Sequence, residues 1–401
     1  MSRKILKTVI LSLCLFTSKY GIGQTARVIP LNTAIEMAIK LNPQTKIADL
    51  RIEKQRVLLP ATRNFDSPEL LFQAPTSDAF RPGIMQKFAM PQVYNQQKKA
   101  QESQIRLTET EKQITSNILR YNVKTVYNEL RYLREVIRNY QRQDSLLADF
   151  VKITDVRVQV GQISRIEKLN AESQYREVQY LLDQIRAKVR SNRIQLGLLI
   201  GMPNDTTLRV SGDFDKLKFI HAVISTDTNF VQNPLTGFYR ENQQLNMELL
   251  SLEKKRRLPN VIVGYLNQGD KNSPVGYRFQ LGVTLPVWGW VFNSRINGAK
   301  KDVEIAQKQI ALNNYELQGT YDKAVSEYRQ YQEALEYYET IGLLQASEII
   351  NAAKDGYRLG SIGYYNYLLN LQQAFKIRLG YLDALRNFNQ SVITLQYLKG
   401  E

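Results

Sequence analysis

The placement of proline is the feature that most constrains how this chain can fold. All twelve prolines lie at or before Pro286, and none occurs between Gln92 and Met202. Proline removes a backbone donor and clashes with the preceding turn, so helix interiors exclude it. The two proline-free segments therefore predict two long helical blocks, and the proline-containing segments predict turns and short strands.

Apolar periodicity supports both helical blocks. In the second block apolar residues recur at alternating spacings of four and three, which is a heptad pattern. The first block carries a similar stripe that skips the position of Asn122. We interpret both stripes as packing surfaces rather than cofactor sites. The stripes are Ile114, Ile118, Val126, Leu130, Leu133 and Ile137, and then Leu317, Tyr321, Ala324, Tyr328, Tyr331 and Leu335.

The two blocks are copies of one another. Placing Gly161 on Gly360 aligns residues 161–201 with residues 360–400 without a gap. The same offset pairs Pro60 with Pro259, Ala100 with Ala299 and Gly201 with Gly400, and brings Asn42 within one residue of Asn242. So long a repeat indicates a duplicated half-molecule rather than a short solenoid unit. We expect a first repeat over 24–203, a connector over 204–232 and a second repeat over 233–401.

Each repeat is predicted to contain a first helix, two short strands, a long helix and a return helix. At 1.5 Å per residue, the long helix would extend about 90 Å. The return helix is too short to match it, so we expect it to stack end to end on the first helix. The predicted first helices are 31–58 and 233–257, the long helices 96–159 and 294–357, and the return helices 165–200 and 365–398.

The clearest strand signal lies between Tyr277 and Val287, where apolar and polar residues alternate. Such a strand has lipid or protein core on one side and water on the other. Trp288 and Trp290 follow, where an interfacial aromatic belt would sit. An ordinary amphipathic hairpin with its tryptophans in the core is the alternative. The other strand candidates are Val261 to Leu266, and, more weakly, Glu69 to Ala74 and Ile84 to Met90.

Residues 1–23 are predicted to be an export signal. Arg3, Lys4 and Lys7 precede an apolar run that is too short to span a bilayer. Removing this segment would lower the formal net charge from +16 to +12, and would remove Cys14. No other segment resembles a transmembrane helix. An exported chain of this kind is expected to be soluble in the periplasm or to form a barrel.

The residue inventory excludes several classes of site. Cys14 is the single cysteine and His221 the single histidine, so a zinc finger, a Cys–His nucleophile and a disulfide framework are excluded. No Walker loop or nucleophile elbow is present, and we predict no enzyme activity, no cofactor and no metal site. The basic residues are spread along the chain without a nucleic-acid-binding signature. We interpret them as a solvated surface that can meet acidic partners or anionic lipids, with no nucleic-acid partner.

Three motifs, in this order and duplicated, resemble the TolC-like outer-membrane efflux protein family. The first is the amphipathic segment from Leu31 that ends on Asn42-Pro43. The second runs from Phe279 to Pro286 and continues into Val287-Trp288-Gly289. The third is the glycine turn that occurs twice, at 157–164 and at 357–363.

The resemblance implies a mainly α fold with a small β part, internally duplicated. A homotrimer would form a periplasmic α-barrel and a shared transmembrane β-barrel, with four strands from each subunit. The chain would then lie in the outer membrane of a Gram-negative bacterium, with a large periplasmic extension. Its lipid-facing residues would be Phe279, Leu281, Val283, Leu285, Trp288 and Trp290.

The resemblance also places the glycine turns at the periplasmic tip, where the family meets its adaptor protein. As an alternative compatible with this role, the glycines are simple helix C-caps. The implied adaptor-contact residues are Gly161, Gln162, Ile163, Ser164, Gly360, Ser361, Ile362 and Gly363.

Family members often carry an acidic gate residue six positions after this glycine, and here those positions are Glu167 and Asn366. Three copies of Glu167 around a narrow axis would favour cations. Because Asn366 is neutral, a ring of paired carboxylates is not expected. The alternative is that Glu167 is an exposed helix residue paired with a neighbouring Lys or Arg.

The function implied is a passive conduit in a tripartite efflux system, in which an inner-membrane pump delivers substrates through the adaptor. The short chain favours the heavy-metal efflux members. An exit duct for secreted polypeptides and a soluble periplasmic coiled-coil scaffold remain alternatives.

Overall fold

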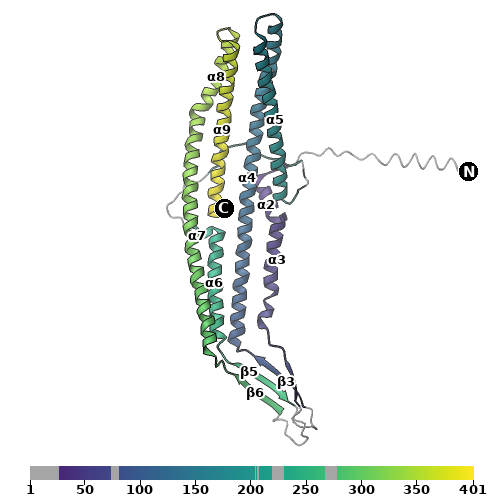
Figure 1. Cartoon of the computed structure of the whole chain (residues 1–401), viewed down its shortest axis with the longest axis vertical. Helices are drawn as coiled ribbons and strands as arrows, with labels where there is room; N and C mark the ends of the chain where they lie inside the picture. The colour runs from purple at the N-terminus through teal and green to yellow at the C-terminus, as the bar shows by residue number, and fades with distance from the viewer. Residues whose placement is uncertain (1–26, 74–80, 204, 206, 219–229, 267–277) are drawn as a thin grey trace, which may run out of the picture.

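The computed structural model describes residues 27–73, 81–203, 205, 207–218, 230–266 and 278–401. The predicted export signal and His221 lie outside these residues. The described chain is a tall bundle of helices with a small sheet at one end (Figure 1). Within these ranges no helix is both long enough and apolar enough to cross a membrane.

The first half of the bundle contains α2 (Leu31–Leu41), α3 (Pro43–Val57), α4 (Pro91–Gln159) and α5 (Arg165–Leu199). The predicted single first helix is wrong, because it is broken at Asn42. Asn42 precedes a proline and is extended, with φ −63° and ψ 133°. Helix α4 starts at Pro91, where a proline needs no donor, and is 69 residues long. At 1.5 Å per residue it extends about 100 Å.

The second half contains α6 (Pro234–Lys255), α7 (Gly289–Tyr337), α8 (Leu343–Arg358) and α9 (Tyr364–Lys399). The long helix predicted here is interrupted by a π-helical turn at Tyr338–Gly342. The ring of Tyr338 occupies space beside Gly342 and Gly380 that a Cβ atom at either glycine would fill. The π turn thus places the Tyr338 ring against Gly380 of α9.

Four antiparallel strands form the sheet in the order β2 (Glu69–Gln73), β3 (Arg81–Phe88), β5 (Asn260–Leu266) and β6 (Phe279–Thr284). The two central strands, β3 and β5, come from different halves of the chain. The weaker strand candidates of the first half are therefore confirmed, with shifted ends. A second, two-stranded parallel sheet joins β1 (Val28–Ile29) to β4 (Arg209–Val210), and no sequence pattern predicted it.

The core consists of apolar clusters along the helices. The predicted stripe of α7 is confirmed, since Leu317, Tyr321, Ala324, Tyr328 and Leu335 are all buried there. The stripe of α4 is partly wrong: Ile118 is 39% exposed, whereas the neighbouring Leu119 is buried. Helix α4 contacts α3, α5, α6 and α9, so its buried face is wider than one heptad stripe.

Asn42 and Asn233 connect helices that are stacked end to end, α5 on α3 and α9 on α6. The Asn42 side chain accepts from the Gln44 backbone N–H at 2.9 Å, and its Nδ2 donates to the Leu199 carbonyl at 3.0 Å. Asn233 makes the same two bonds, to the Leu235 N–H and to the Leu398 carbonyl, each at 2.8 Å. Helix α5 thus stacks on α3, and α9 on α6, as the helix lengths predicted (Figure 1).

The structural counterpart of Asn42 is therefore Asn233, and the predicted pairing with Asn242 is wrong. Asn242 lies inside α6, where its Nδ2 is 3.4 Å from Gln309. The fixed offset aligns the return helices, whose caps match. It fails for the first helices, because α3 has 15 residues and α6 has 22.

Candidate functional site

The two glycine turns lie at the end of the bundle opposite the sheet (Figure 1). Gly161 has φ 71° and Gly360 has φ 74°, the left-handed conformation that glycine adopts without strain. The next residue donates its backbone N–H to the carbonyl five positions earlier, Gln162 to Arg157 at 2.8 Å and Ser361 to Gly356 at 2.9 Å. Both turns are thus Schellman helix caps, as expected for glycine at this position.

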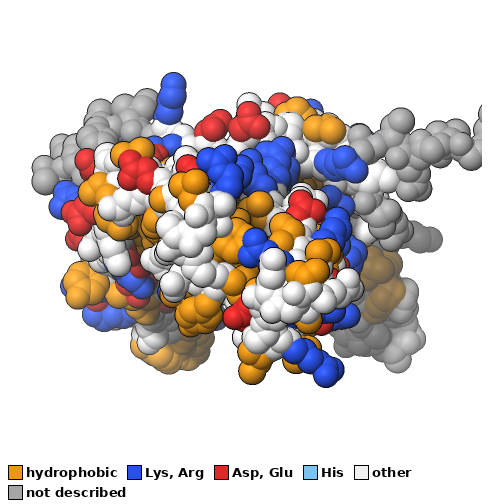
Figure 2. Space-filling model, turned by 90° about the horizontal axis from the view of Figure 1, so that it is seen from above, with side chains coloured by type: hydrophobic (Ala, Val, Ile, Leu, Met, Phe, Trp, Pro, Cys, Tyr) orange, Lys and Arg blue, Asp and Glu red, His pale blue; other side chains and the backbone are white. Residues whose placement is uncertain are grey.

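The exposure of the tip residues is the same in both turns. The residues at the first, second and fourth positions are exposed, and the isoleucine at the third position, Ile163 or Ile362, is half-buried. In a view onto this end, lysine and arginine side chains gather near the middle (Figure 2). The tip therefore offers two matched turns and nearby positive charge. The exposed tip residues are Gly161, Gln162, Ser164, Gly360, Ser361 and Gly363.

Among the described residues no hydrogen bond joins the two gate candidates, Glu167 and Asn366. Glu167 is half-buried in the first turn of α5, where its backbone N–H donates to Ser164 Oγ at 3.3 Å. Asn366 is exposed on α9. No ion pair of Glu167 occurs among the described residues, since the adjacent Lys168 pairs with Asp155 and Glu172 instead.

An aromatic cluster beneath the tip joins the two hairpins, and no sequence pattern predicted it. Phe150 of α4 stacks on Tyr364 of α9 and also contacts Tyr357 and Tyr367. The Tyr364 hydroxyl is buried and finds no hydrogen-bond partner among the residues that the structure describes. Burial raises the pKa of Tyr364, and the nearby charge of Glu167 raises it further. The cluster therefore connects the tip helices of one half to those of the other.

The sheet has one apolar face that crosses all four strands. Residues that face each other in an antiparallel register lie on the same side, and the register pairs Val263 with Leu281 and Ile84 with Tyr265. Leu281 is 80% exposed. The exposed apolar side chains of this face are Leu70, Phe72, Ile84, Val263, Phe279, Leu281 and Val283.

The tryptophans lie outside the core of the chain. Trp288 is 61% and Trp290 64% exposed, and their rings form an edge-to-face pair with centroids 5.1 Å apart. The hairpin alternative, which placed them in a core, is therefore wrong. Leu285 is also exposed, although β6 ends one residue earlier. The alternation in the sequence predicted this face on β6 only.

Among the described residues no group of three or more His, Cys, Asp or Glu side chains is placed to hold a metal ion. Buried polar side chains instead join structural elements, such as α4 and the β1–β4 sheet. Tyr127 is an example, since its buried hydroxyl donates to the Ile29 carbonyl at 2.9 Å and accepts from the Ser211 N–H at 2.8 Å.

One curated protein resembles the chain at the level of sequence. The chain is 22% identical over 245 residues to the cobalt-zinc-cadmium resistance protein CzcC of Cupriavidus metallidurans. The match covers 61% of this chain and 58% of that protein, a little over half its length. No protein-family model matches the chain.

Solved outer-membrane channels resemble it over nearly its whole length. The outer membrane channel CmeC of Campylobacter jejuni superposes with a TM-score of 0.72 at 18% identity, covering 92% of this chain and 85% of that one. The open state of the Neisseria gonorrhoeae outer membrane channel MtrE gives 0.75 at 15% identity, covering 92% and 88%. The prediction of a mainly helical fold with a small sheet is confirmed, and the chain has the fold of the TolC-like outer-membrane channels.

Proposed function

We propose that this chain is one subunit of a homotrimeric duct in the outer membrane of a Gram-negative bacterium. The observation that carries the proposal is the exposed apolar face across all four strands, at one end of helices about 100 Å long. A contiguous apolar surface of this kind is unfavourable in water and favourable against lipid. The tryptophans that follow β6 suit the level of the lipid headgroups.

The open sheet supports a trimer. Strands β2 and β6 are the outermost strands, each with one neighbour in the sheet order. Unpaired strand edges are not tolerated in lipid, and four strands are too few to close a barrel. Three subunits would supply twelve strands and pair every edge. Assembly would therefore be obligatory for insertion.

The efflux role is supported by the sequence similarity to CzcC, a cobalt-zinc-cadmium resistance protein. We infer a passive, water-filled conduit of the heavy-metal efflux subgroup, with two repeats at 24–203 and 233–401. An inner-membrane pump would supply energy and selectivity, and a periplasmic adaptor would contact the tip at Gly161–Ser164 and Gly360–Gly363. Metal ions would be cargo in transit.

The gate is proposed at the tip end. Three copies of Glu167 would place carboxylates around the axis, and opening would shift the return helices against the long ones. In planar lipid bilayers, Glu167→Gln should lower the preference for cations over anions. Asp149→Asn, on the exposed part of α4, should leave it unchanged. Equal selectivity of both variants and the parent would remove Glu167 from the gate.

The test of the duct itself is extraction of the protein from membranes with detergent, followed by electron microscopy of single particles. A threefold tube more than about 100 Å long is expected. Recovery in the soluble fraction without detergent would favour the coiled-coil scaffold, and a compact monomer would overturn the duct. An exit duct for polypeptides has the same architecture. Impaired export of a polypeptide, with unchanged metal tolerance, in a deletion strain would favour it.

A further inference from the structure

A pocket of about 580 Å³ opens where α4 and α5 meet the small β1–β4 sheet. Its walls are partly apolar, with Leu130 and Val189 among them, and no aspartate or glutamate is among the described residues that line it. Four arginines line it: Arg134, Arg138, Arg193 and Arg209. We call this the arginine pocket. Its volume lies within the range of small-molecule sites.

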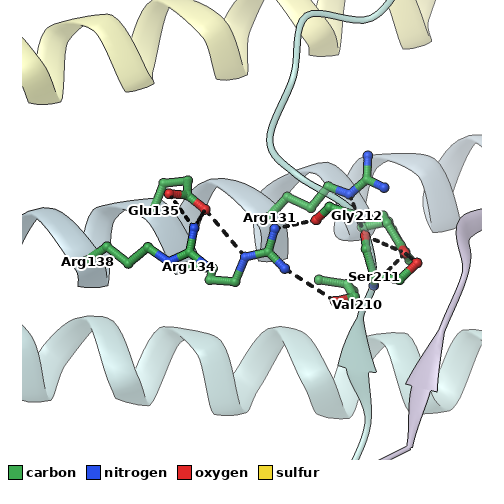
Figure 3. Close-up of polar contacts among 8 residues, drawn as sticks. Arg131, Arg134, Glu135, Arg138, Val210, Ser211 and Gly212 are labelled. Atoms are coloured by element: carbon green, nitrogen blue, oxygen red, sulfur yellow. Dashed lines mark hydrogen bonds and ion pairs between the residues drawn. The ribbon is translucent and has the colours of Figure 1, made fainter.

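The arginines on α4 are partly explained by local structure. Arg131, which lies beside the pocket, donates from Nε to the Ser211 carbonyl at 3.0 Å. Arg134 donates to the carbonyls of Val210 and Gly212 (Figure 3). These two side chains therefore hold the end of β4 against α4.

One carboxylate serves two guanidinium groups here. Glu135 Oε1 lies 2.7 Å from Arg138 Nη1 and 3.4 Å from Arg134 Nε. The buried Nε of Arg134 makes no hydrogen bond, because the geometry of the longer contact is unsuitable. The single negative charge of Glu135 therefore neutralises only part of the positive charge of Arg134 and Arg138.

Arg193 and Arg209 have no neighbouring carboxylate of this kind among the described residues. In the described part of the chain neither forms an ion pair or a side-chain hydrogen bond. Burial lowers the pKa of Arg193, and the nearby positive charge of Arg209 lowers it further, because like charges repel. Counting Glu135 against the four arginines, the pocket carries a net charge of +3. Arg193 is half-buried and Arg209 is exposed, so their positive charge attracts an anion to the opening of the pocket.

The second repeat shows that helix packing does not require an arginine at this position. The offset that places Gly161 on Gly360 places Arg193 on Val392 and Val189 on Phe388. Val392 is fully buried in the apolar core of the second half. The same position on the return helix thus holds an apolar core residue in one repeat and an unpaired cation in the other.

We propose that the arginine pocket binds a small organic anion that carries a carboxylate or phosphate group beside an apolar portion. The planar guanidinium forks of Arg193 and Arg209 match the oxygens of either group. Leu130 and Val189 would contact the apolar portion. The pocket lies within one subunit, so this proposal stands independently of the duct.

The test is isothermal titration calorimetry on the purified full-length protein in detergent at low ionic strength. The probes are benzoate, phenyl phosphate and their neutral relative benzamide. Saturable binding is expected for at least one anion and not for benzamide, and the stronger anion identifies the preferred group. Arg193→Gln should weaken this binding about tenfold or more.

Two further variants separate binding from folding. Arg193→Val copies the second repeat and should fold with unchanged thermal stability while losing the anion. Arg186→Gln removes another α5 arginine, one that is exposed and paired with Asp183 at 2.9 Å, and should bind as the parent does. The proposal is overturned if neither anion binds saturably, if benzamide binds equally well, or if Arg193→Val retains full affinity.

Discussion

The rings of Phe150 and Tyr364 stack with their centroids 4.5 Å apart and their planes 16° apart. Phe150 belongs to the α4–α5 hairpin and Tyr364 to the α8–α9 hairpin, so this contact joins the two tip hairpins of one subunit. Aromatic pairs of this kind contribute about 0.5–1.5 kcal/mol beyond the area that they bury. The contact would resist any movement of one hairpin away from the other.

Replacement of Phe150 by alanine should therefore loosen the tip. We expect Phe150→Ala to raise the conductance of the channel in planar lipid bilayers, because the closed arrangement loses its aromatic contact. Tyr365→Ala is the matched control, since Tyr365 is exposed on the neighbouring position of α9. Unchanged conductance in an intact Phe150→Ala trimer would contradict a closing role for the cluster.

Alkaline pH should destabilise the folded chain. Burial raises the pKa values of Tyr132 and Tyr364 above the ordinary value of 10.0. Their contribution is fully present below about pH 10 and is lost as the pH rises further, because the unfolded chain ionises first. Thermal unfolding measured between pH 8 and pH 12 should show this loss. Tyr364→Phe should flatten the curve without lowering stability at pH 8, because the buried hydroxyl has no partner.

The helix joints should depend on their asparagines. Asn233→Ala removes an N-cap and the bond to the Leu398 carbonyl, so we expect a loss of about 1–2 kcal/mol in the free energy of unfolding. Asn42→Ala should cost a similar amount. Asn242→Ala, one residue from the position that the sequence offset selects, should cost much less. Chemical denaturation of the three variants measures this, and an equal effect at Asn242 would refute the joint assignment.

The apolar face of the sheet should tolerate no charge. Leu281→Arg places a cation on this face, and we expect a cost of about 2–4 kcal/mol in lipid, with loss of detergent-resistant trimers from the membrane fraction. Gln280→Arg is the control, because residue 280 points to the opposite face of β6. Normal trimer yield for Leu281→Arg would exclude lipid contact at this position.

Local patterns predicted the elements that depend on local chemistry. Proline placement predicted the long helices, and the glycines at 161 and 360 predicted the turns, because both residue types act through their own backbone angles. The break at Asn42 also follows a local rule, since residues before proline avoid the helical conformation. The single helix predicted over 31–58 did not take this rule into account.

Contacts between distant segments could not be predicted from the sequence patterns. The buried stripe of α4 includes Leu119 rather than Ile118, because several helices pack around α4 at once. The π turn at Tyr338 depends on Gly380 of another helix. The arginine pocket draws on α4, α5 and a strand of two residues, and no short-range signal identifies such a strand.

The sequence by itself determined the long helices, the glycine turns, the duplication and the alternation of β6. Each of these depends on residues close together in the chain or on a repeat that can be counted. The tertiary structure alone decided that the strands of both repeats share one sheet with a single apolar face. It also decided that Asn42 corresponds to Asn233, and that Phe150 meets Tyr364. These relations depend on which surfaces of distant segments pack together when apolar area is buried. Short-range sequence patterns do not predict that packing.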